Sequence, residues 1–187
     1  MKKTISIIIS IAMCAMLASC GGVKNEVSDK KQPTLVDTMS LEEKVGQILF
    51  VRCVEDGQTY DLMSIKPGGI LMFGRDFEGL TKDEVKEKIQ SYQDKSDIPL
   101  IIGADEEGGT VVRVSSNPNL APEKFKSPQE IYNEGGMDAV VENATEKSEL
   151  LLSLGVNMNL APVADVSTNP SDYMYDRSLG QNAEVTA

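Results

Sequence analysis

Short apolar runs alternate with amphipathic stretches along this chain, and this alternation decides which fold classes are open to it. Residues 70–73 (Ile-Leu-Met-Phe) and 99–104 (Pro-Leu-Ile-Ile-Gly-Ala) are almost wholly apolar, which predicts strands buried on both faces. Residues 81–92 and 137–155 have apolar side chains at helical spacing, so each is predicted to form an amphipathic helix. Because parallel strands need helical crossovers between them, the alternation predicts an α/β fold built on a parallel sheet.

The predicted helices have recognisable ends. Ser40 with Glu43, and Thr81 with Glu84, have the spacing of a capping box, in which two side chains satisfy backbone N–H groups at a helix start. The folded body is therefore expected to begin near Ser40. Gly155 is the expected end of the 137–155 helix.

The last part of the chain predicts a barrel that is not completed. Residues 156–160 (Val-Asn-Met-Asn-Leu) alternate apolar side chains with amides, which suits a barrel wall that lines a polar site. Residues 182–187 look like the opening of a further helix. Since a (β/α)8 TIM barrel needs roughly 250 residues, the chain is expected to cover about the first half of one, truncated at its C-terminus. A flavodoxin-like domain is the weaker alternative, because no phosphate-binding loop follows the first strand.

The N-terminus has the pattern of a bacterial lipoprotein signal peptide. Lys2 and Lys3 precede an apolar stretch at residues 5–17, and Leu-Ala-Ser-Cys-Gly at 17–21 resembles a lipobox. This predicts that Cys20 receives lipid after cleavage and anchors the protein at the cell membrane, on the exported side. A plain secretory signal with an incidental cysteine is one alternative, and a single transmembrane anchor is another.

The domain boundaries follow from this processing. Residues 1–19 are predicted to be the signal peptide, residues 20–38 a flexible polar tether, and residues 39–187 the folded body. Once Cys14 is removed and Cys20 is lipidated, Cys53 is left as a free thiol, so no intramolecular disulfide is expected.

The composition excludes several kinds of chemistry. The chain has no histidine, which rules out Ser-His-Asp and Cys-His catalysis and histidine-ligated zinc for these 187 residues. The formal net charge of −11 argues against a nucleic-acid partner. Carboxylates, arginines and backbone groups must therefore provide any function.

Two carboxylates, Asp105 and Asp165, directly follow predicted strands. Ligands of parallel α/β folds bind beyond the carboxyl ends of the strands, and paired carboxylates suit glycoside hydrolysis or divalent-ion binding. Each is equally expected as a loop residue that caps backbone amides. The Asp-Glu-Glu run at 105–107 is interpreted as exposed charge rather than a metal site, since adjacent side chains project in different directions. For Asp176 and Arg177, a local salt bridge is the ordinary interpretation.

Three blocks of the sequence, in order, resemble segments of glycoside hydrolase family 3. Residues 102–113 (Ile-Gly-Ala-Asp-Glu-Glu-Gly-Gly-Thr-Val-Val-Arg) resemble its D-Q-E-G-G-R-V-x-R segment. Residues 154–166 resemble its L-G-I-N-x-N-x-A-P-V-x-D-V strand, and residues 169–180 resemble its N-P…x-R-S-F-G loop. Residues 69–74 also resemble its G-G-I-I-L-F strand. The resemblance extends over about residues 39–187 and is to the β-N-acetylhexosaminidase branch.

The resemblance implies a (β/α)8 barrel that acts on terminal β-linked N-acetylglucosamine, commonly in cell-wall (peptidoglycan) turnover. By position, Asp105 matches the aspartate that hydrogen-bonds sugar hydroxyls, and Arg113 and Arg177 match the two arginines of the sugar subsite. Carboxylate and guanidinium groups suit hydroxyl and acetamide groups as partners. Asp165 also matches a motif position, and is expected to support its loop rather than touch sugar.

The sequence departs from the family pattern at two positions and lacks its catalytic groups. Glu106 replaces the usual Gln and Thr110 the usual Arg, which is expected to add negative charge beside the site and to change substrate choice. The family's K-H-F-P-G-H-G block, with its histidine acid–base, and its later aspartate nucleophile both lie beyond Ala187. The implied mechanism of the whole protein is retaining, with attack by the aspartate while the histidine protonates the leaving oxygen.

The resemblance therefore predicts a partial enzyme. No catalytic residue, cofactor or metal is expected within these residues, and the chain alone is expected to be inactive and only marginally stable, because a half barrel leaves a strand edge uncovered. A catalytically inactive glycan-binding lipoprotein is the alternative. The presence or absence of the histidine block further along the gene distinguishes the two.

Overall fold

The computed structural model describes residues 32–54 and 59–187, which divide into two units after Thr38. In the first unit, α2 (Leu35–Thr38) is a single helical turn, and the backbone N–H and hydroxyl of Thr34 each donate to Asp37 Oδ2 at 2.8 Å. The end of the expected tether thus contains a helical turn. The predicted signal peptide and Cys20 lie outside the described residues. Within the described ranges, no helix has both the length and the apolar character needed to cross a bilayer.

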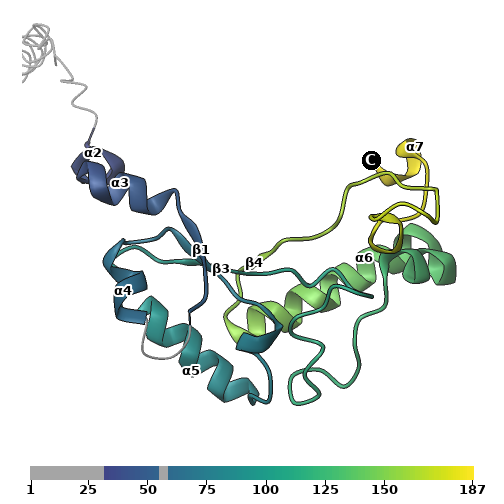
Figure 1. Cartoon of the computed structure of the whole chain (residues 1–187), viewed down its shortest axis with the longest axis horizontal. Helices are drawn as coiled ribbons and strands as arrows, with labels where there is room; N and C mark the ends of the chain where they lie inside the picture. The colour runs from purple at the N-terminus through teal and green to yellow at the C-terminus, as the bar shows by residue number, and fades with distance from the viewer. Residues whose placement is uncertain (1–31, 55–58) are drawn as a thin grey trace, which may run out of the picture. The chain divides into compact units, whose positions relative to one another are not determined.

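The second unit, Met39–Ala187, is built on a four-stranded sheet whose strands are all parallel and lie in the order β1-β2-β3-β4 (Figure 1). The strands are β1 (Phe50–Arg52), β2 (Gly69–Leu71), β3 (Ile101–Ala104) and β4 (Met158–Asn159). The helices are α3 (Leu41–Gln47), α4 (Thr59–Ser64), α5 (Lys82–Gln93), α6 (Pro128–Leu154) and α7 (Ala183–Thr186), with 3-10 turns η1 (Gly74–Asp76) and η2 (Tyr175–Arg177). This sequential parallel order, as in a (β/α)8 barrel, confirms the predicted fold class.

The helix ends follow the local sequence. Ser40 and Thr81 form the two predicted capping boxes, which begin α3 and α5, and Gly155 ends α6 in the left-handed conformation at φ 93°. A third capping box was not predicted. It is formed by Ser127 and Glu130, with a proline at the first helical position.

Two element boundaries differ from the prediction. Helix α6 begins at Pro128 rather than near residue 137, and it bends at Gly135 and Gly136, whose backbone angles are not helical. Strand β1 was not predicted, because its three residues follow α3 so closely that they resemble a continuation of the helical pattern.

The prediction of strands buried on both faces is wrong. Side chains on one face of the sheet, including Ile70, Met72 and Ile102, are fully buried together with residues of α5 and α6. On the other face, Ile101 is 42% exposed. There the ring of Phe50 lies against Gly69 and Gly103, where an added Cβ would come within 2.6 and 2.5 Å of the ring. An uninterrupted apolar run therefore does not show that both faces of a strand are buried, since this sheet has one packed face and one partly exposed face.

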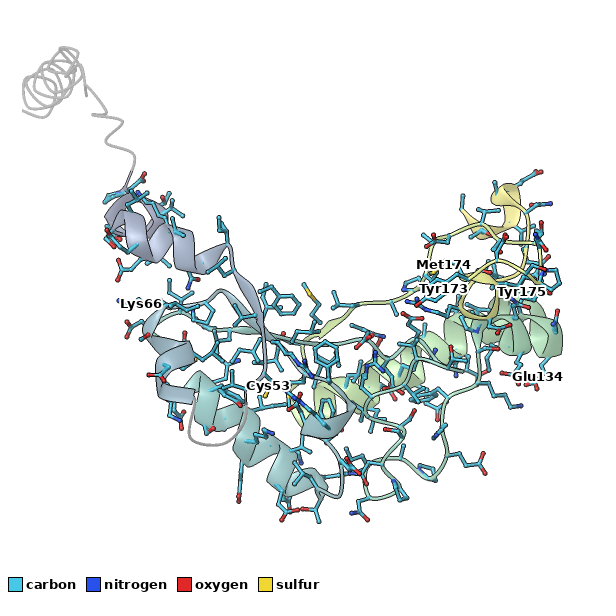
Figure 2. The ribbon with its side chains drawn as sticks, in the orientation of Figure 1. Cys53, Lys66, Glu134, Tyr173, Met174 and Tyr175 are labelled. Atoms are coloured by element: carbon cyan, nitrogen blue, oxygen red, sulfur yellow. The ribbon has the colours of Figure 1, made fainter. Side chains whose placement is uncertain are left out.

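The packed face contains the cysteine that was expected to stay free. Cys53 follows β1 and is buried as a free thiol, with its Sγ 3.1 Å from the hydroxyl of Tyr92 on α5 (Figure 2). Burial raises the pKa of this thiol, so it stays protonated at neutral pH.

Candidate functional site

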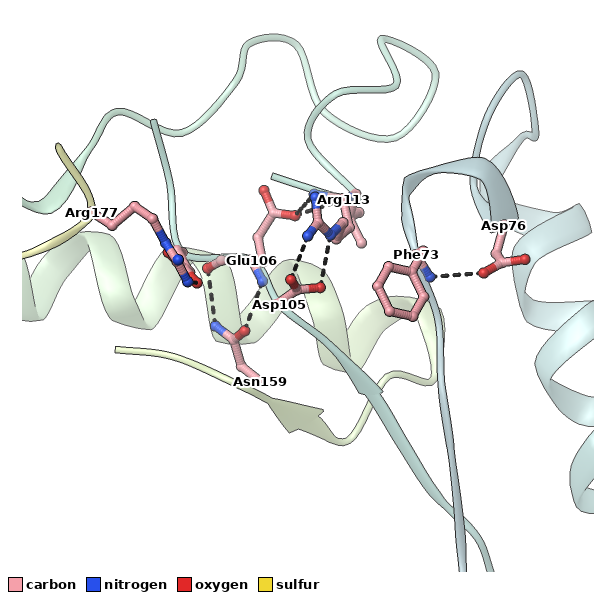
Figure 3. A network of polar contacts seen from close by, with 9 residues as sticks. Phe73, Asp76, Asp105, Glu106, Arg113, Asn159 and Arg177 are labelled. Atoms are coloured by element: carbon pink, nitrogen blue, oxygen red, sulfur yellow. Dashed lines mark hydrogen bonds and ion pairs between the residues drawn. The ribbon is translucent and has the colours of Figure 1, made fainter. Parts of the chain in front are cut away.

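The candidate site lies where β3 ends, at the Asp-Glu-Glu run 105–107 (Figure 3). Asp105 is the first residue after the strand and forms a two-pronged ion pair with Arg113, whose Nε and Nη2 donate to Oδ1 at 2.7 Å and Oδ2 at 2.5 Å. The structure thus brings together two of the three predicted sugar-binding residues. This pairing raises the pKa of Arg113 further and holds its planar fork in one orientation.

Glu106 points into the loop that follows the 105–107 run. Its side chain is fully buried and accepts hydrogen bonds from the backbone N–H groups of Arg113 and Val114, each at 2.7 Å, and of Ser115 at 3.3 Å. The hydroxyl of Ser115 donates to it as well. The Glu106 carboxylate thus lies beside the site, where its charge acts on Arg113, and it also fixes the backbone that positions Arg113.

Glu107 pairs with the third predicted residue, Arg177 of η2. Arg177 Nε donates to Glu107 Oε2 at 2.9 Å, and Nη2 donates to Oε1 at 2.6 Å. This pair raises the pKa of Arg177 above its already high value. The predicted local salt bridge with Asp176 is not formed. The prediction of an exposed acidic run is also wrong, since Glu106 and Glu107 are both buried.

A buried lysine beneath this run was missed by the sequence reasoning. Lys147 of α6 is only 8% exposed, and its Nζ donates to the backbone carbonyl of Glu107 at 2.7 Å. The ammonium also lies 5.6 Å from the centre of the Phe125 ring. Burial lowers the pKa of Lys147, while the nearby carboxylates oppose that shift. One sequence signal was present: Lys147 precedes the buried Leu151 by four residues, which places it on the buried face of the helix.

Two amides tie β4 to β3. Asn157 accepts from the N–H of Ile102 at 2.8 Å and donates to the carbonyl of Leu100 at 3.1 Å. Asn159 accepts from the N–H of Glu106 at 3.0 Å and donates to its carbonyl at 3.2 Å. Both amides thus replace backbone partners beside a strand of only two residues, and Asn159 does so within the 105–107 run.

An aromatic ring lies beside the Asp105–Arg113 pair. Phe73 follows β2, and the guanidinium carbons of Arg52 and Arg113 lie 4.7 and 5.7 Å from the centre of its ring. Its backbone N–H donates to Asp76 Oδ2 at 2.8 Å, which fixes the turn that holds the ring (Figure 3). The sequence reasoning assigned Phe73 only to an apolar strand.

Two other positions singled out in the sequence lie apart from this network. Asp165 is exposed and forms no hydrogen bond or ion pair with any residue that the structure describes, so the supporting role expected for it is not observed. Thr110, at the family's usual arginine position, is exposed as well.

The arrangement is suited to binding a neutral polar ligand. Asp105, Arg113 and Arg177 present hydrogen-bonding groups at the carboxyl end of a parallel sheet, and their geometry is fixed by contacts within the protein. Each oxygen of a carboxylate has two lone pairs, so Asp105 can accept from ligand hydroxyls while it remains paired with Arg113.

Comparison with known proteins places this chain in a family. The glycosyl hydrolase family 3 N terminal domain matches residues 40–187. Beta-hexosaminidase A of Pseudoalteromonas piscicida is 30% identical over 122 residues, which are 63% of this chain and 20% of that protein. Beta-hexosaminidase LpqI of Mycobacterium tuberculosis is 31% identical over 153 residues, which are 80% of this chain and 38% of that protein. The chain thus spans well under half the length of these relatives.

Solved structures agree with the fold described above. A glycoside hydrolase family 3 beta-N-acetylglucosaminidase from Paenibacillus superimposes with a TM-score of 0.69 at 26% identity, over 79% of this chain and 29% of that chain. A family 3 glycosyl hydrolase from Mycobacterium smegmatis superimposes with a TM-score of 0.67 at 24% identity, over 80% of this chain and 44% of that chain. The chain therefore belongs to glycoside hydrolase family 3, and its match to the N-terminal domain of that family covers residues 40–187.

Proposed function

We propose that the complete gene product is a retaining glycosidase that removes terminal β-linked N-acetylglucosamine from cell-wall-type glycans. One observation supports this above all. Asp105, Arg113 and Arg177, the three residues expected to bind the sugar, come together around residues 105–107 at the end of β3. Relatives named beta-hexosaminidase and beta-N-acetylglucosaminidase support the same substrate class.

Each of the three residues has a role in this proposal. The Asp105 carboxylate accepts hydrogen bonds from two sugar hydroxyls, and the guanidinium groups of Arg113 and Arg177 donate to hydroxyl and acetamide oxygens. The ion pairs hold these groups in place before substrate arrives, so substrate binding has to immobilise few side chains and loses little conformational entropy. The histidine acid–base and the aspartate nucleophile are supplied by residues beyond Ala187.

The test starts from the gene. Sequencing past codon 187 is expected to reveal a Lys-His-Phe-Pro-Gly-His-like block and a later aspartate, and the complete product is expected to hydrolyse 4-nitrophenyl N-acetyl-β-D-glucosaminide. The 187 residues alone are expected to be inactive. A stop codon directly after Ala187, together with measurable binding of N-acetylglucosamine, would instead support a catalytically inactive glycan-binding lipoprotein.

Substitutions test the residue roles. Asp105→Asn and Arg177→Met are each expected to lower kcat/KM by roughly 10- to 100-fold, as is usual when a hydrogen bond to a charged group is lost. Asp176→Asn is the matched control, because Asp176 is exposed and adjacent to Arg177 but not paired with it. If the control loses as much activity as Arg177→Met, the assigned roles are wrong.

We further propose that lipid on Cys20 anchors the protein at the cell membrane. The sequence Leu-Ala-Ser-Cys-Gly at 17–21 supports this. Growth with an alkyne fatty acid is expected to label the wild-type protein and not a Cys20→Ser variant, which should also leave the membrane fraction. Equal labelling of both proteins would contradict the proposal.

A further inference from the structure

The site contains as many buried or half-buried cations as carboxylates. The run 105–107 supplies three negative charges, and Arg113, Arg177 and Lys147 supply three positive ones. Two of the cations are committed to direct ion pairs, Arg113 with Asp105 and Arg177 with Glu107. This leaves Glu106 and Lys147 as the two charges without an ion-pair partner among the described residues.

Glu106 and Lys147 are both buried, and both use neutral groups for their hydrogen bonds. Glu106 accepts from three backbone N–H groups and one hydroxyl, and Lys147 donates to the backbone carbonyl of Glu107. They therefore hold the run from two sides: Glu106 fixes the loop that follows it, and Lys147 fixes the peptide of Glu107. Buried charges of opposite sign on neighbouring groups stabilise each other even without direct contact, because the interior screens them weakly.

Lys147 also lies close beneath the turn after the run. A Cβ built on Gly108 would come within 3.2 Å of Lys147 Nζ, and the glycine backbone there has a φ of 101°. The ammonium is thus enclosed by the Glu107 carbonyl, the Gly108 turn and the face of Phe125. A cation in this enclosure loses most of its hydration and needs a compensating negative charge nearby.

We propose that Lys147 is a positioning residue for the sugar subsite, and that it is required because residue 106 is a glutamate. Its ammonium balances the charge of Glu106, so that the run 105–107 stays in the geometry that presents Asp105 and Arg177. The inference rests on the proposed function, since it concerns the same sugar subsite.

The test is a double-mutant cycle in the complete gene product, with Glu106→Gln and Lys147→Met. The readouts are the affinity for N-acetylglucosamine by calorimetry and kcat/KM for the nitrophenyl substrate. Lys147→Met alone is expected to weaken sugar binding by about tenfold, since it leaves the run with an excess negative charge. The double variant has balanced charge again, so it is expected to recover to within about threefold of wild type.

Matched controls separate this effect from general loss of packing. Lys86→Met removes an exposed lysine of α5, and Glu149→Gln removes an exposed glutamate of α6; both are expected to leave sugar affinity unchanged. Melting temperatures of all variants are measured in parallel. Lys147→Met removes the same packing in the single and the double variant, so recovery in the double variant reports charge balance and not side-chain shape.

The outcomes are distinct. Recovery of affinity in the double variant supports the inference. If the wild type binds and hydrolyses the sugar, but the fold losses of affinity of the two single variants multiply in the double variant, the inference is overturned while the proposed function stands. If the double variant regains its melting temperature but not its sugar affinity, Lys147 supports the fold only, and the positioning role is overturned. If the wild type neither binds nor hydrolyses the sugar, the proposed function fails and this inference fails with it.

Discussion

Replacing either partner of the Glu107–Arg177 ion pair is expected to destabilise the fold, but by different amounts. The two side chains differ in exposure: 4% of Glu107 reaches solvent, against 25% of Arg177. Each substitution removes one charge and leaves the other in place. The cost of the substitution therefore depends on how well water can reach the group that is left behind.

The exposures set the expected magnitudes. Arg177→Met leaves a carboxylate that is almost wholly buried, and removing one partner of such a pair costs about 3–5 kcal/mol. Glu107→Gln leaves a guanidinium that is one-quarter exposed, and the glutamine oxygen still accepts one of its two hydrogen bonds. We expect this variant to lose about 1–2 kcal/mol, as for a hydrogen bond to a charged group. The expected difference is about 2 kcal/mol, or roughly 30-fold in the unfolding equilibrium.

Urea unfolding of the complete gene product, followed by circular dichroism, measures both free energies of unfolding. Asp176→Asn again serves as the control and is expected to stay within about 0.5 kcal/mol of wild type, as surface substitutions do. Equal losses for Glu107→Gln and Arg177→Met, or a larger loss for Glu107→Gln, would refute the reasoning that solvent access to the remaining partner sets the cost.

Three further results are expected. Gly108→Ala should lower the free energy of unfolding by about 2–4 kcal/mol in urea, because φ is 101° and the new Cβ would lie 2.1 Å from the carbonyl oxygen of Lys126. The control Gly74→Ala, with open space around the new Cβ, should cost under about 0.5 kcal/mol, and similar losses for the two variants would contradict this reasoning. Asn159→Ala should lower the free energy of unfolding by about 1–3 kcal/mol, because it removes the hydrogen bonds of Asn159 to the backbone N–H and carbonyl of Glu106. An unchanged urea midpoint would show that these two hydrogen bonds are dispensable. Burial raises the pKa of Cys53, so folding takes up a proton once the unfolded thiol ionises, and the free energy of unfolding should fall as pH rises above about 8.5. A Cys53→Ser variant should lack this fall above a pH of about 8.5, and a pH profile of stability identical to that of wild type would contradict the prediction.

The parts of the fold that depend on local sequence could be predicted. The capping boxes at Ser40 and Thr81 and the helix end at Gly155 each need only a few neighbouring residues, and all three were found where expected. The parallel sheet could be predicted from the alternation of apolar runs with amphipathic helices, because few fold classes are compatible with that alternation. Strand β1, three residues long, gave no periodicity to recognise.

The partners within the site could not be predicted, because they come from distant parts of the chain. Arg177 pairs with Glu107, which lies 70 residues earlier, and not with the neighbouring Asp176. Lys147 comes from α6 and reaches the Glu107 carbonyl 40 residues earlier. The resemblance to family 3 pointed to Asp105, Arg113 and Arg177 as candidate sugar-binding residues. The burial of Glu106 could not be predicted, because it depends on the three-dimensional arrangement of the following loop.

The divergence of the three side chains after β3 limits how the chain length can vary here. The three consecutive residues have different partners: Asp105 binds the Arg113 side chain, Glu106 binds the backbone of the following loop, and Glu107 binds Arg177. Deleting one of them would move every later side chain to the wrong partner, as a one-residue slip does in a strand. In contrast, an extra residue between Glu123 and Lys124, both exposed, leaves these partners unchanged. Natural insertions and deletions are therefore expected to be tolerated in the later loop and absent from the three residues that follow β3.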